Sequence, residues 1–182
     1  SSATPDLAGL MERILAAAFE QEIVLDAIVP ASDAQQQKLW QLREEISAAQ
    51  KPEGGSIKHD ISVPVSRYAD FIREADIAVR KIVPGFRSVA FGHIGDGNVH
   101  YNPLQPVDMD KEVYLSHWEE VSRAVHDIAV RMRGSISAEH GIGRLKADDL
   151  VHYKPAVEID LMRRIKKALD PDGIMNPGKL LK

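Results

Sequence analysis

Apolar residues recur three and four positions apart in several long stretches, which is the spacing of one buried helix face. These stretches predict helices over residues 4–20, 33–48, 66–83, 108–133, 146–152 and 155–169. Capping and stop residues bound some of them: Ser32 or Asp33 begins the second helix, and Gly134 ends the fourth.

Other stretches carry the pattern of β-strands. Residues 22–29 are rich in β-branched side chains, residues 58–65 alternate between polar and apolar, and residues 135–138 form a short strand. Pro64 favours a sheet edge or a strand end for the second stretch. Residues 86–104 predict a β-hairpin. Because these strands mix with long helices without regular βαβ alternation, we expect an α+β fold, an antiparallel sheet covered on one face by helices.

Composition excludes several classes of protein. With 182 residues, 44% hydrophobic and 27% charged, the chain matches a globular domain, not a disordered or fibrous protein. A net charge of -4 argues against nucleic-acid binding, and no apolar run is long enough for a membrane span. Neither a glycine-rich dinucleotide turn nor a phosphate-binding loop occurs. Because the chain has no cysteine, any metal ion must bind to His, Asp, Glu or Asn.

The predicted hairpin brings two histidines together. Asp96-Gly97 is typical of a two-residue type I′ turn, in which both central residues need positive φ. That turn pairs His93 with His100, with the side chains on one face and Cβ atoms about 5 Å apart. Asn102 falls on the same face. The simpler alternative is a pair of stacked, partly exposed histidines without a ligand.

A second segment can complete a metal site. Glu139-His140 follows the short strand at 135–138, and Gly141 and Gly143 allow the chain to turn there. Both side chains could then enter one cleft. A Glu added to two His gives a His2Glu set with open coordination positions, and His140 remains as a general base. The alternative is that Glu139 caps a neighbouring segment and His140 only lines a loop.

The three motifs together resemble a family. Residues 93–100 (HIGDGNVH), 139–143 (EHGIG) and 176–179 (NPGK) look like the C-terminal part of FAD-linked 2-hydroxyacid dehydrogenases. These are the D-lactate, glycolate and D-2-hydroxyglutarate dehydrogenase relatives of the vanillyl-alcohol oxidase superfamily. The resemblance implies a ferredoxin-like substrate domain over residues 1–182. It also implies a separate N-terminal FAD-binding domain in the same protein, of which this chain shows no trace.

The resemblance also assigns roles in the reaction. It implies that His93, His100 and Glu139 bind a divalent metal, zinc first and manganese or iron as alternatives. It implies that His140 is the catalytic base. The metal would bind the α-hydroxyl and a carboxylate oxygen of the substrate and lower the pKa of that hydroxyl.

Further contacts come from the same resemblance. Arg43 and Lys58 would bind substrate carboxylates, and Asn102 would be another substrate contact. Asn176 would lie near the flavin. Taken alone, Arg43 and Lys58 would be read as solvated surface residues, but a planar guanidinium suits bidentate binding of a carboxylate.

The expected activity is oxidation of a small D-2-hydroxy acid to the 2-oxo acid by hydride transfer to FAD. The 182-residue chain by itself is expected to be folded but inactive. Two other functions stay open: a self-sufficient metal-dependent hydrolase with the same His2Glu site, and a non-catalytic metal-stabilised docking domain. Expected partners are the substrate and the FAD-binding domain, and the protein could form a homodimer. Because no secretion signal is visible, we expect a bacterial cytoplasmic location or, in a eukaryote, the mitochondrial matrix.

Overall fold

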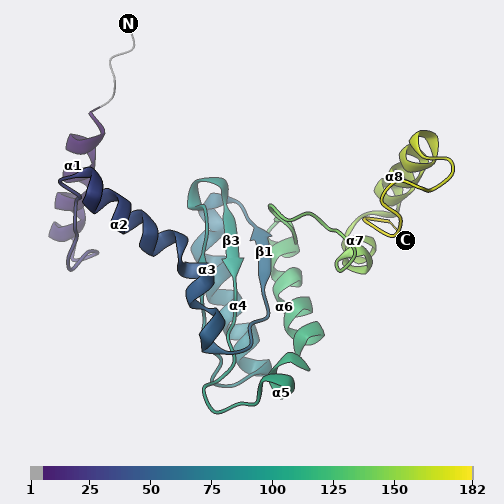
Figure 1. The fold of residues 1–182 in the computed structure, drawn as a ribbon, viewed down its shortest axis with the longest axis horizontal. Helices are drawn as coiled ribbons and strands as arrows, with labels where there is room; N and C mark the ends of the chain where they lie inside the picture. The colour runs from purple at the N-terminus through teal and green to yellow at the C-terminus, as the bar shows by residue number, and fades with distance from the viewer. Residues whose placement is uncertain (1–5, 182) are drawn as a thin grey trace, which may run out of the picture. The chain divides into compact units, whose positions relative to one another are not determined.

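The computed structural model describes residues 6–181 and separates the chain into two compact units, Ser1–Gln50 and Lys51–Lys182. Its described residues contain eight α-helices and one three-stranded antiparallel sheet, so the predicted α+β class is confirmed (Figure 1). None of the described helices is long and apolar enough to cross a membrane.

The first unit consists of helices α1 (Leu7–Glu20), α2 (Asp33–Glu44) and α3 (Ile46–Ala49). Asp6 caps α1 by accepting the Gly9 N–H, and Ser32 caps α2 by accepting the Gln35 N–H. The two predicted helices are thus confirmed, although the second is interrupted at Glu45. Residues 4 and 5 of the first predicted range lie outside the described residues.

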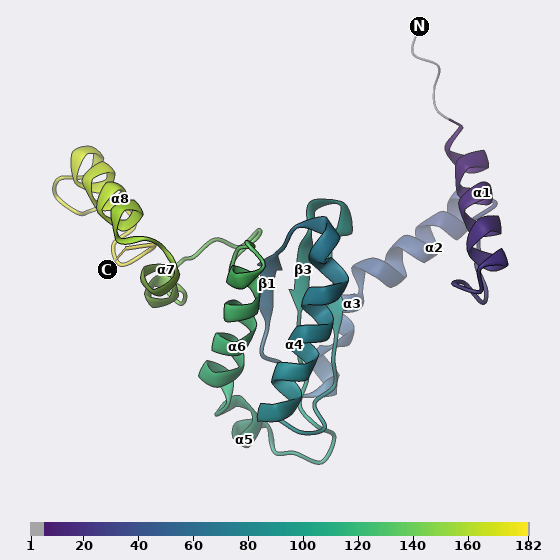
Figure 2. The same cartoon turned by 180° about the vertical axis from the view of Figure 1, so that it is seen from behind.

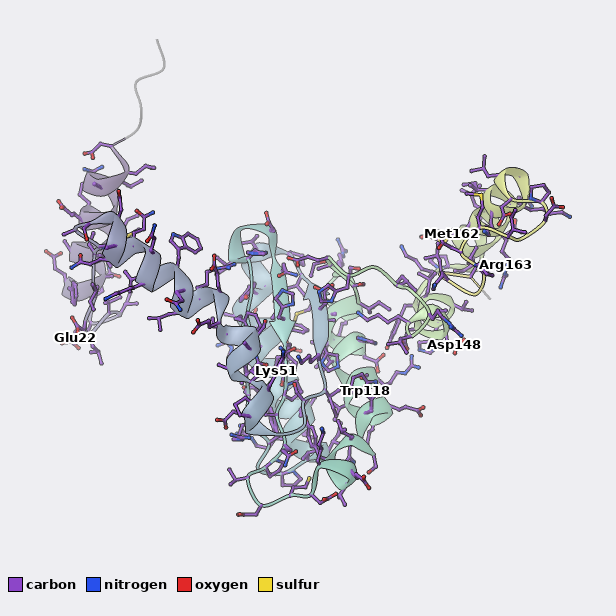
Figure 3. All side chains as sticks on the ribbon, in the orientation of Figure 1. Glu22, Lys51, Trp118, Asp148, Met162 and Arg163 are labelled. Carbon is purple, nitrogen blue, oxygen red and sulfur yellow. The ribbon has the colours of Figure 1, made fainter. Side chains whose placement is uncertain are left out.

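The strand predicted over residues 22–29 is wrong, because this stretch is irregular and mostly exposed. Ile23 and Leu25 have exposed fractions of 71% and 92%. A β-branched run becomes a strand only where a neighbouring strand can pair with it. The described part of the first unit contains no strand that could pair with it; its side chains are drawn in Figure 3.

The second unit is built on the sheet. Strands β1 (His59–Ser62), β2 (Ala90–Phe91) and β3 (Asn98–Tyr101) follow the spatial order β1-β3-β2, all antiparallel. Helices α4 (Tyr68–Ile82) and α6 (Trp118–Arg131) cover one face of this sheet, as the opposite views in Figures 1 and 2 show. β1 is an edge strand of this sheet, as Pro64 predicts.

The hydrophobic core lies between the sheet and these two helices. Ile61 of β1 and Val99 of β3 point into it, and both are fully buried. Each helix contributes residues at helical spacing. The buried core residues of α4 and α6 are Phe71, Ala75, Val79, Val121, Val125, Ile128 and Ala129.

The chain order strand–helix–strand–strand–helix is that of a ferredoxin-like βαββαβ unit without its last strand. The predicted fourth strand at 135–138 is reduced to one bridge, in which Ser135 and Ser62 exchange backbone hydrogen bonds of 2.8 and 3.0 Å. Gly134 makes this approach feasible, because a Cβ there would lie 2.0 Å from the Ser62 carbonyl oxygen. The segment after α6 is therefore held against β1.

The remaining elements are short turns and the last helices. The predicted helix over 108–133 is divided into α5 (Lys111–Leu115) and α6, with Ser116 bonding back to the Val113 carbonyl at the break. The two predicted C-terminal helices are confirmed as α7 (Ala147–Tyr153) and α8 (Ala156–Leu169). Three 3-10 turns complete the list: η1 (Lys51–Glu53), η2 (Val65–Arg67) and η3 (Ile94–Asp96).

Candidate functional site

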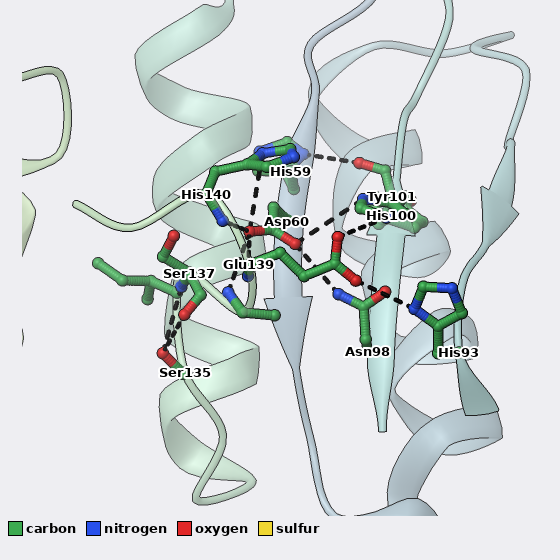
Figure 4. A network of polar contacts seen from close by, with 12 residues as sticks. His59, Asp60, His93, Asn98, His100, Tyr101, Ser135, Ser137, Glu139 and His140 are labelled. Atoms are coloured by element: carbon green, nitrogen blue, oxygen red, sulfur yellow. Dashed lines mark hydrogen bonds and ion pairs between the residues drawn. The ribbon is translucent and has the colours of Figure 1, made fainter. Parts of the chain in front are cut away.

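The face of the sheet opposite α4 and α6, which we call the site face, carries polar side chains from β1 and β3. Successive strand residues point to opposite faces. Because Ile61 and Val99 enter the core, Asp60, Asn98 and His100 lie on the site face. Asp60 is directly opposite His100. Figure 4 shows the polar contacts that these residues make.

The predicted pairing of His93 with His100 is wrong. His93 exchanges two backbone hydrogen bonds of 3.1 Å with Asn98, and His100 is opposite Phe91. The connection is a four-residue loop containing the 3-10 turn η3, and only Gly97 within it has positive φ. A two-residue type I′ turn would also need positive φ at Asp96, which the loop avoids.

The two histidines nevertheless share a face, because the register differs from the expected one by two residues and side chains alternate with period two. They flank one carboxylate. His93 Nδ1 lies 3.0 Å from Glu139 Oε1, and His100 Nε2 lies 3.8 Å from Glu139 Oε2 (Figure 4). The three predicted metal ligands are thus brought together around Glu139.

His140 stands beside this group. Its ring is stacked on that of His100, with centroids 5.8 Å apart. Its Nδ1 atom lies 3.7 Å from Asp60 Oδ2, and its side chain is 68% exposed. The predicted base therefore has a carboxylate on one side and an accessible face on the other.

Sequence reasoning missed Asp60. Its side chain is only 3% exposed, yet it accepts hydrogen bonds from the backbone N–H groups of residues 138–140 and from the Asn98 amide. Burial favours a raised pKa for this carboxyl. The N–H groups of His140 and Glu139, together with positive charge on His140 and Lys146, outweigh burial and lower the pKa below its ordinary value. The signal in the sequence is an acid at an alternating position of a strand, facing the same side as His100.

Two predicted substrate contacts belong to the same sheet. Asn102 directly follows β3 and is buried, and its N–H donates to the Val89 carbonyl. Lys58 precedes β1 and is exposed. Continuing the register of β1 and β3 by one residue sets Lys58 opposite Asn102, on the site face and two residues along the strands from the Asp60–His100 pair.

The other predicted contacts lie elsewhere. Arg43 belongs to α2 of the first unit, where its guanidinium lies over the Trp40 ring at 5.5 Å. Asn176 follows α8 and has φ of +47°; it lines an apolar hollow of about 570 Å³ together with Met162, Leu169 and Met175. The roles of both residues stay predictions.

A second pair of histidines lies on the core side of the sheet. His59 and His126 meet edge to face, with ring centroids 5.6 Å apart. Burial lowers the pKa of His59 to about 3, and a nearby positive charge on His126 adds to this effect. Burial also lowers the pKa of His126 to about 4, although Asp149 opposes the shift. Both side chains are buried, which fits a structural role.

The family model described as FAD linked oxidases, C-terminal domain, matches residues 4–180. The chain belongs to this family. The resemblance drawn from its three motifs is thereby confirmed.

Three relatives of this FAD-linked oxidase domain share a name. D-2-hydroxyglutarate dehydrogenase of Stutzerimonas stutzeri is 44% identical over 161 residues, covering 88% of this chain and 34% of the relative. The enzyme of that name from Xanthomonas citri is 41% identical, covering 89% of this chain and 34% of the relative. The mitochondrial enzyme of Rattus norvegicus is 34% identical, covering 96% and 31% respectively. The FAD-linked oxidase domain described here thus spans about a third of the length of these relatives.

Proposed function

We propose that this chain is the substrate- and metal-binding domain of a FAD-dependent dehydrogenase that oxidises a D-2-hydroxy acid to the 2-oxo acid. The observation that carries the proposal is the grouping of His93, Glu139 and His100 beside His140. Membership of the FAD-linked oxidase family and relatives named D-2-hydroxyglutarate dehydrogenase support it.

His93, His100 and Glu139 fit a divalent metal ion. Two imidazole nitrogens lie 3.0 and 3.8 Å from the two oxygens of one carboxylate. Such nitrogen and carboxylate donors suit zinc, manganese or iron. When bound, the ion would supply Lewis acidity that lowers the pKa of the substrate's α-hydroxyl.

His140 would take the proton of that hydroxyl. Because its Nδ1 faces the Asp60 carboxylate, with Oδ2 at 3.7 Å, the negative charge favours a proton on Nδ1 and leaves Nε2 to accept the substrate's proton. The Asp60 carboxylate would stabilise the imidazolium that forms. FAD, when bound, would supply the acceptor for the α-carbon hydrogen and its electron pair, so the substrate would lose two electrons and become the 2-oxo acid.

Lys58 and Asn102 would bind the substrate's carboxylate ends, and Arg43 would provide a bidentate guanidinium contact. Lys58 is exposed and lies two residues along β1 from Asp60, the partner of His100. Two cationic contacts suit two carboxylates. We therefore propose a dicarboxylic substrate of the size of D-2-hydroxyglutarate in preference to D-lactate.

The flavin would be held mainly by a FAD-binding domain elsewhere in the same protein, because the chain spans only about a third of its relatives. Residues 1–182 would then act as a single substrate domain, with Asn176 near the flavin. We propose the bacterial cytoplasm or the mitochondrial matrix as its location, and mitochondrial is in the name of the rat relative.

A substrate series tests this function. The full-length flavoprotein is assayed with D-2-hydroxyglutarate and D-lactate, and with Arg43→Ala and Lys58→Ala variants. We expect kcat/KM to be higher for the dicarboxylic acid and each variant to lower it, with KM carrying much of the loss. Lys51→Ala in η1 is the matched control. Equal activity on both acids would refute the dicarboxylic preference, and no oxidation of either would refute the function.

A further inference from the structure

Asp60 is a buried acid at the centre of the site, in the middle of β1. It is directly opposite His100 across the strand pair, and its side chain is 3% exposed. A buried carboxylate is costly unless hydrogen bonds or opposite charges compensate it. Each of its two oxygens has hydrogen-bond donors of its own, from a different segment of the chain.

Oxygen Oδ2 is surrounded by consecutive backbone donors. The N–H groups of Ala138, Glu139 and His140 point at it from 3.1, 2.8 and 2.9 Å. Successive N–H groups that converge in this way form an anion-binding nest. The segment thus leaves the strand direction at Ala138 and wraps around the carboxylate. From this segment the side chains of Glu139 and His140 both reach the site face, Glu139 beside His93 and His140 beside His100.

Oxygen Oδ1 faces the sheet. It accepts a 3.1 Å hydrogen bond from Asn98 Nδ2 and lies 3.8 Å from His100 Nδ1. The other nitrogen of that ring, Nε2, points to Glu139 at 3.8 Å. A carboxylate beside Nδ1 favours the tautomer with the proton on Nδ1, so the lone pair of Nε2 faces Glu139.

We propose that Asp60 is the positioning residue of this site: its one carboxylate directs Glu139 and His140 through their backbone N–H groups and sets the tautomer of His100. The hydrogen bonds above give the geometry of this anchoring, whereas its purpose rests on the proposed metal-binding function. It assigns a shared cause to the orientation of two proposed ligands and the proposed base.

Direct coordination by Asp60 is the competing assignment. One donor atom each from Asp60, His100 and Glu139 lies within 4.8 Å of the other two. However, Oδ2 already accepts three hydrogen bonds and Oδ1 accepts one. A metal ion would compete with these bonds, whereas His93 offers a ring nitrogen next to Glu139 on the accessible side. We therefore assign Asp60 to the outer shell.

Two substitutions of Asp60 separate the effect of its negative charge from the effect of its hydrogen bonds to residues 138–140. In Asp60→Asn the amide oxygen can still accept from the 138–140 segment. Asn98 Oδ1 has no hydrogen-bond partner among the described residues. If the Asn98 amide rotates by 180°, this oxygen can accept from the new amide N–H₂. Asp60→Ala removes charge and anchor together. Asp76→Asn is the matched control, because Asp76 accepts from Tyr101 and Ser88 on the opposite side of the sheet.

The full-length flavoprotein is used for two measurements: Zn²⁺ affinity by calorimetry, and amide hydrogen exchange of the peptide containing residues 135–141 by mass spectrometry. We expect Asp60→Asn to weaken Zn²⁺ binding about 10- to 100-fold, as for loss of an outer-shell carboxylate, with exchange close to wild type. Asp60→Ala should weaken Zn²⁺ binding at least as much and raise the exchange rate about tenfold or more. Asp76→Asn should change neither quantity.

Unchanged affinity and unchanged exchange in Asp60→Ala would overturn the proposal. Complete loss of Zn²⁺ stoichiometry in Asp60→Asn, with normal exchange, would also overturn it and make Asp60 a ligand. If the wild-type protein binds no Zn²⁺, the proposed metal function fails on its own. The exchange data then still decide the anchoring: faster exchange in Asp60→Ala but not in Asp60→Asn supports it, and any other result refutes it.

Discussion

The ring of His140 lies parallel to the ring of His100 to within 26°, with centroids 5.8 Å apart, while its Nδ1 atom faces Asp60. A proposed base and a proposed metal ligand are thus adjacent, and the Nδ1 atom of each ring faces a different oxygen of Asp60. His100 faces the Glu139 carboxylate, and His140 does not have a contact of that kind among the described residues. This difference makes the two histidines separable by mutation.

His140→Ala should therefore remove the base and leave the metal ligands intact. We expect unchanged metal content and a fall in kcat of about 10²–10⁴-fold, the usual range for a general acid–base group. Metal analysis and steady-state kinetics of the full-length enzyme check this. His117→Ala, at the start of α6, is the control and should keep full activity. If His140→Ala loses the metal, His140 is a ligand and Glu139 becomes the candidate base.

His93→Ala and His100→Ala should each weaken metal binding severely, because each removes one of two nitrogens that flank the Glu139 carboxylate. Loss of one ligand leaves too few donors for a stable site. Elemental analysis after dialysis measures the effect, and His152→Ala on α7 serves as the control. Full metal content and full turnover in both variants would show that the site is assigned to the wrong residues.

Gly97→Ala should destabilise the loop that carries His93. Gly97 has φ of +70°, and a Cβ there would lie 1.9 Å from the Val63 carbonyl oxygen. The left-handed conformation alone costs a non-glycine residue roughly 1–2 kcal/mol, and the backbone clash adds to this. Gly95→Ala in the same loop is the control, because a Cβ there meets nothing within 4 Å. Equal unfolding free energies of the two variants in urea would contradict the prediction.

Acid should destabilise the fold through His59 and His126. Burial lowers their pKa values to about 3 and about 4, against 6.5 in the unfolded chain. As the pH falls from about 6.5 towards 4, the unfolded chain binds protons that the folded chain excludes. Each histidine then reduces the unfolding free energy by up to about 1.4 kcal/mol per pH unit. Above about pH 7 both are neutral in either state, and this dependence ends.

Urea unfolding of the protein and of His126→Phe at several pH values measures this contribution. The variant keeps an aromatic ring beside His59 but cannot take up a proton, so its unfolding free energy should fall less between pH 6.5 and pH 4.5. The same pH dependence in both proteins would exclude His126 as a source of the acid sensitivity.

Local sequence patterns were sufficient to predict most helices, because apolar spacing and caps such as Ser32 are short-range signals. The strand predicted over 22–29 shows the limit of the same approach. Its β-branched residues have a strand preference, but a strand needs a partner, and pairing depends on residues distant in sequence. Nothing in the local composition of that stretch indicates that the partner is missing.

The hairpin shows a different limit. Asp96-Gly97 favoured a two-residue turn, yet the loop starts two residues earlier and uses only Gly97 in the left-handed region. Two contacts with Val63 link this loop to the end of β1. Gly97 lies close to the Val63 carbonyl, and the Val63 N–H donates to the Gly97 carbonyl. Such tertiary contacts decide between turn types of similar local preference. The shared face of the two histidines was nevertheless predictable. Side chains alternate between the two faces of a strand, so a change of the pairing register by two residues leaves each side chain on its face.

Asp60 could not be found from motif spacing. Its role depends on β1 pairing with β3, which sets it opposite His100, and on the segment after α6 folding back against β1. Asp60 and His100 are 40 residues apart in the sequence, and Ser62 and Ser135 are 73 residues apart. No local periodicity encodes such pairings. The motifs thus indicated the proposed ligands and the proposed base, whereas the residue that we propose as their anchor could be identified only from the fold.

Anaerobic reduction of the flavin tests the central claim most directly. The full-length protein is mixed with D-2-hydroxyglutarate in the absence of oxygen, before and after removal of its metal, and the loss of flavin absorbance is followed over a single turnover. We expect rapid bleaching with the metal present, severe slowing once it is removed, and recovery when Zn²⁺ or Mn²⁺ is returned. Equally fast bleaching without metal, or no bleaching by any 2-hydroxy acid, would contradict the account.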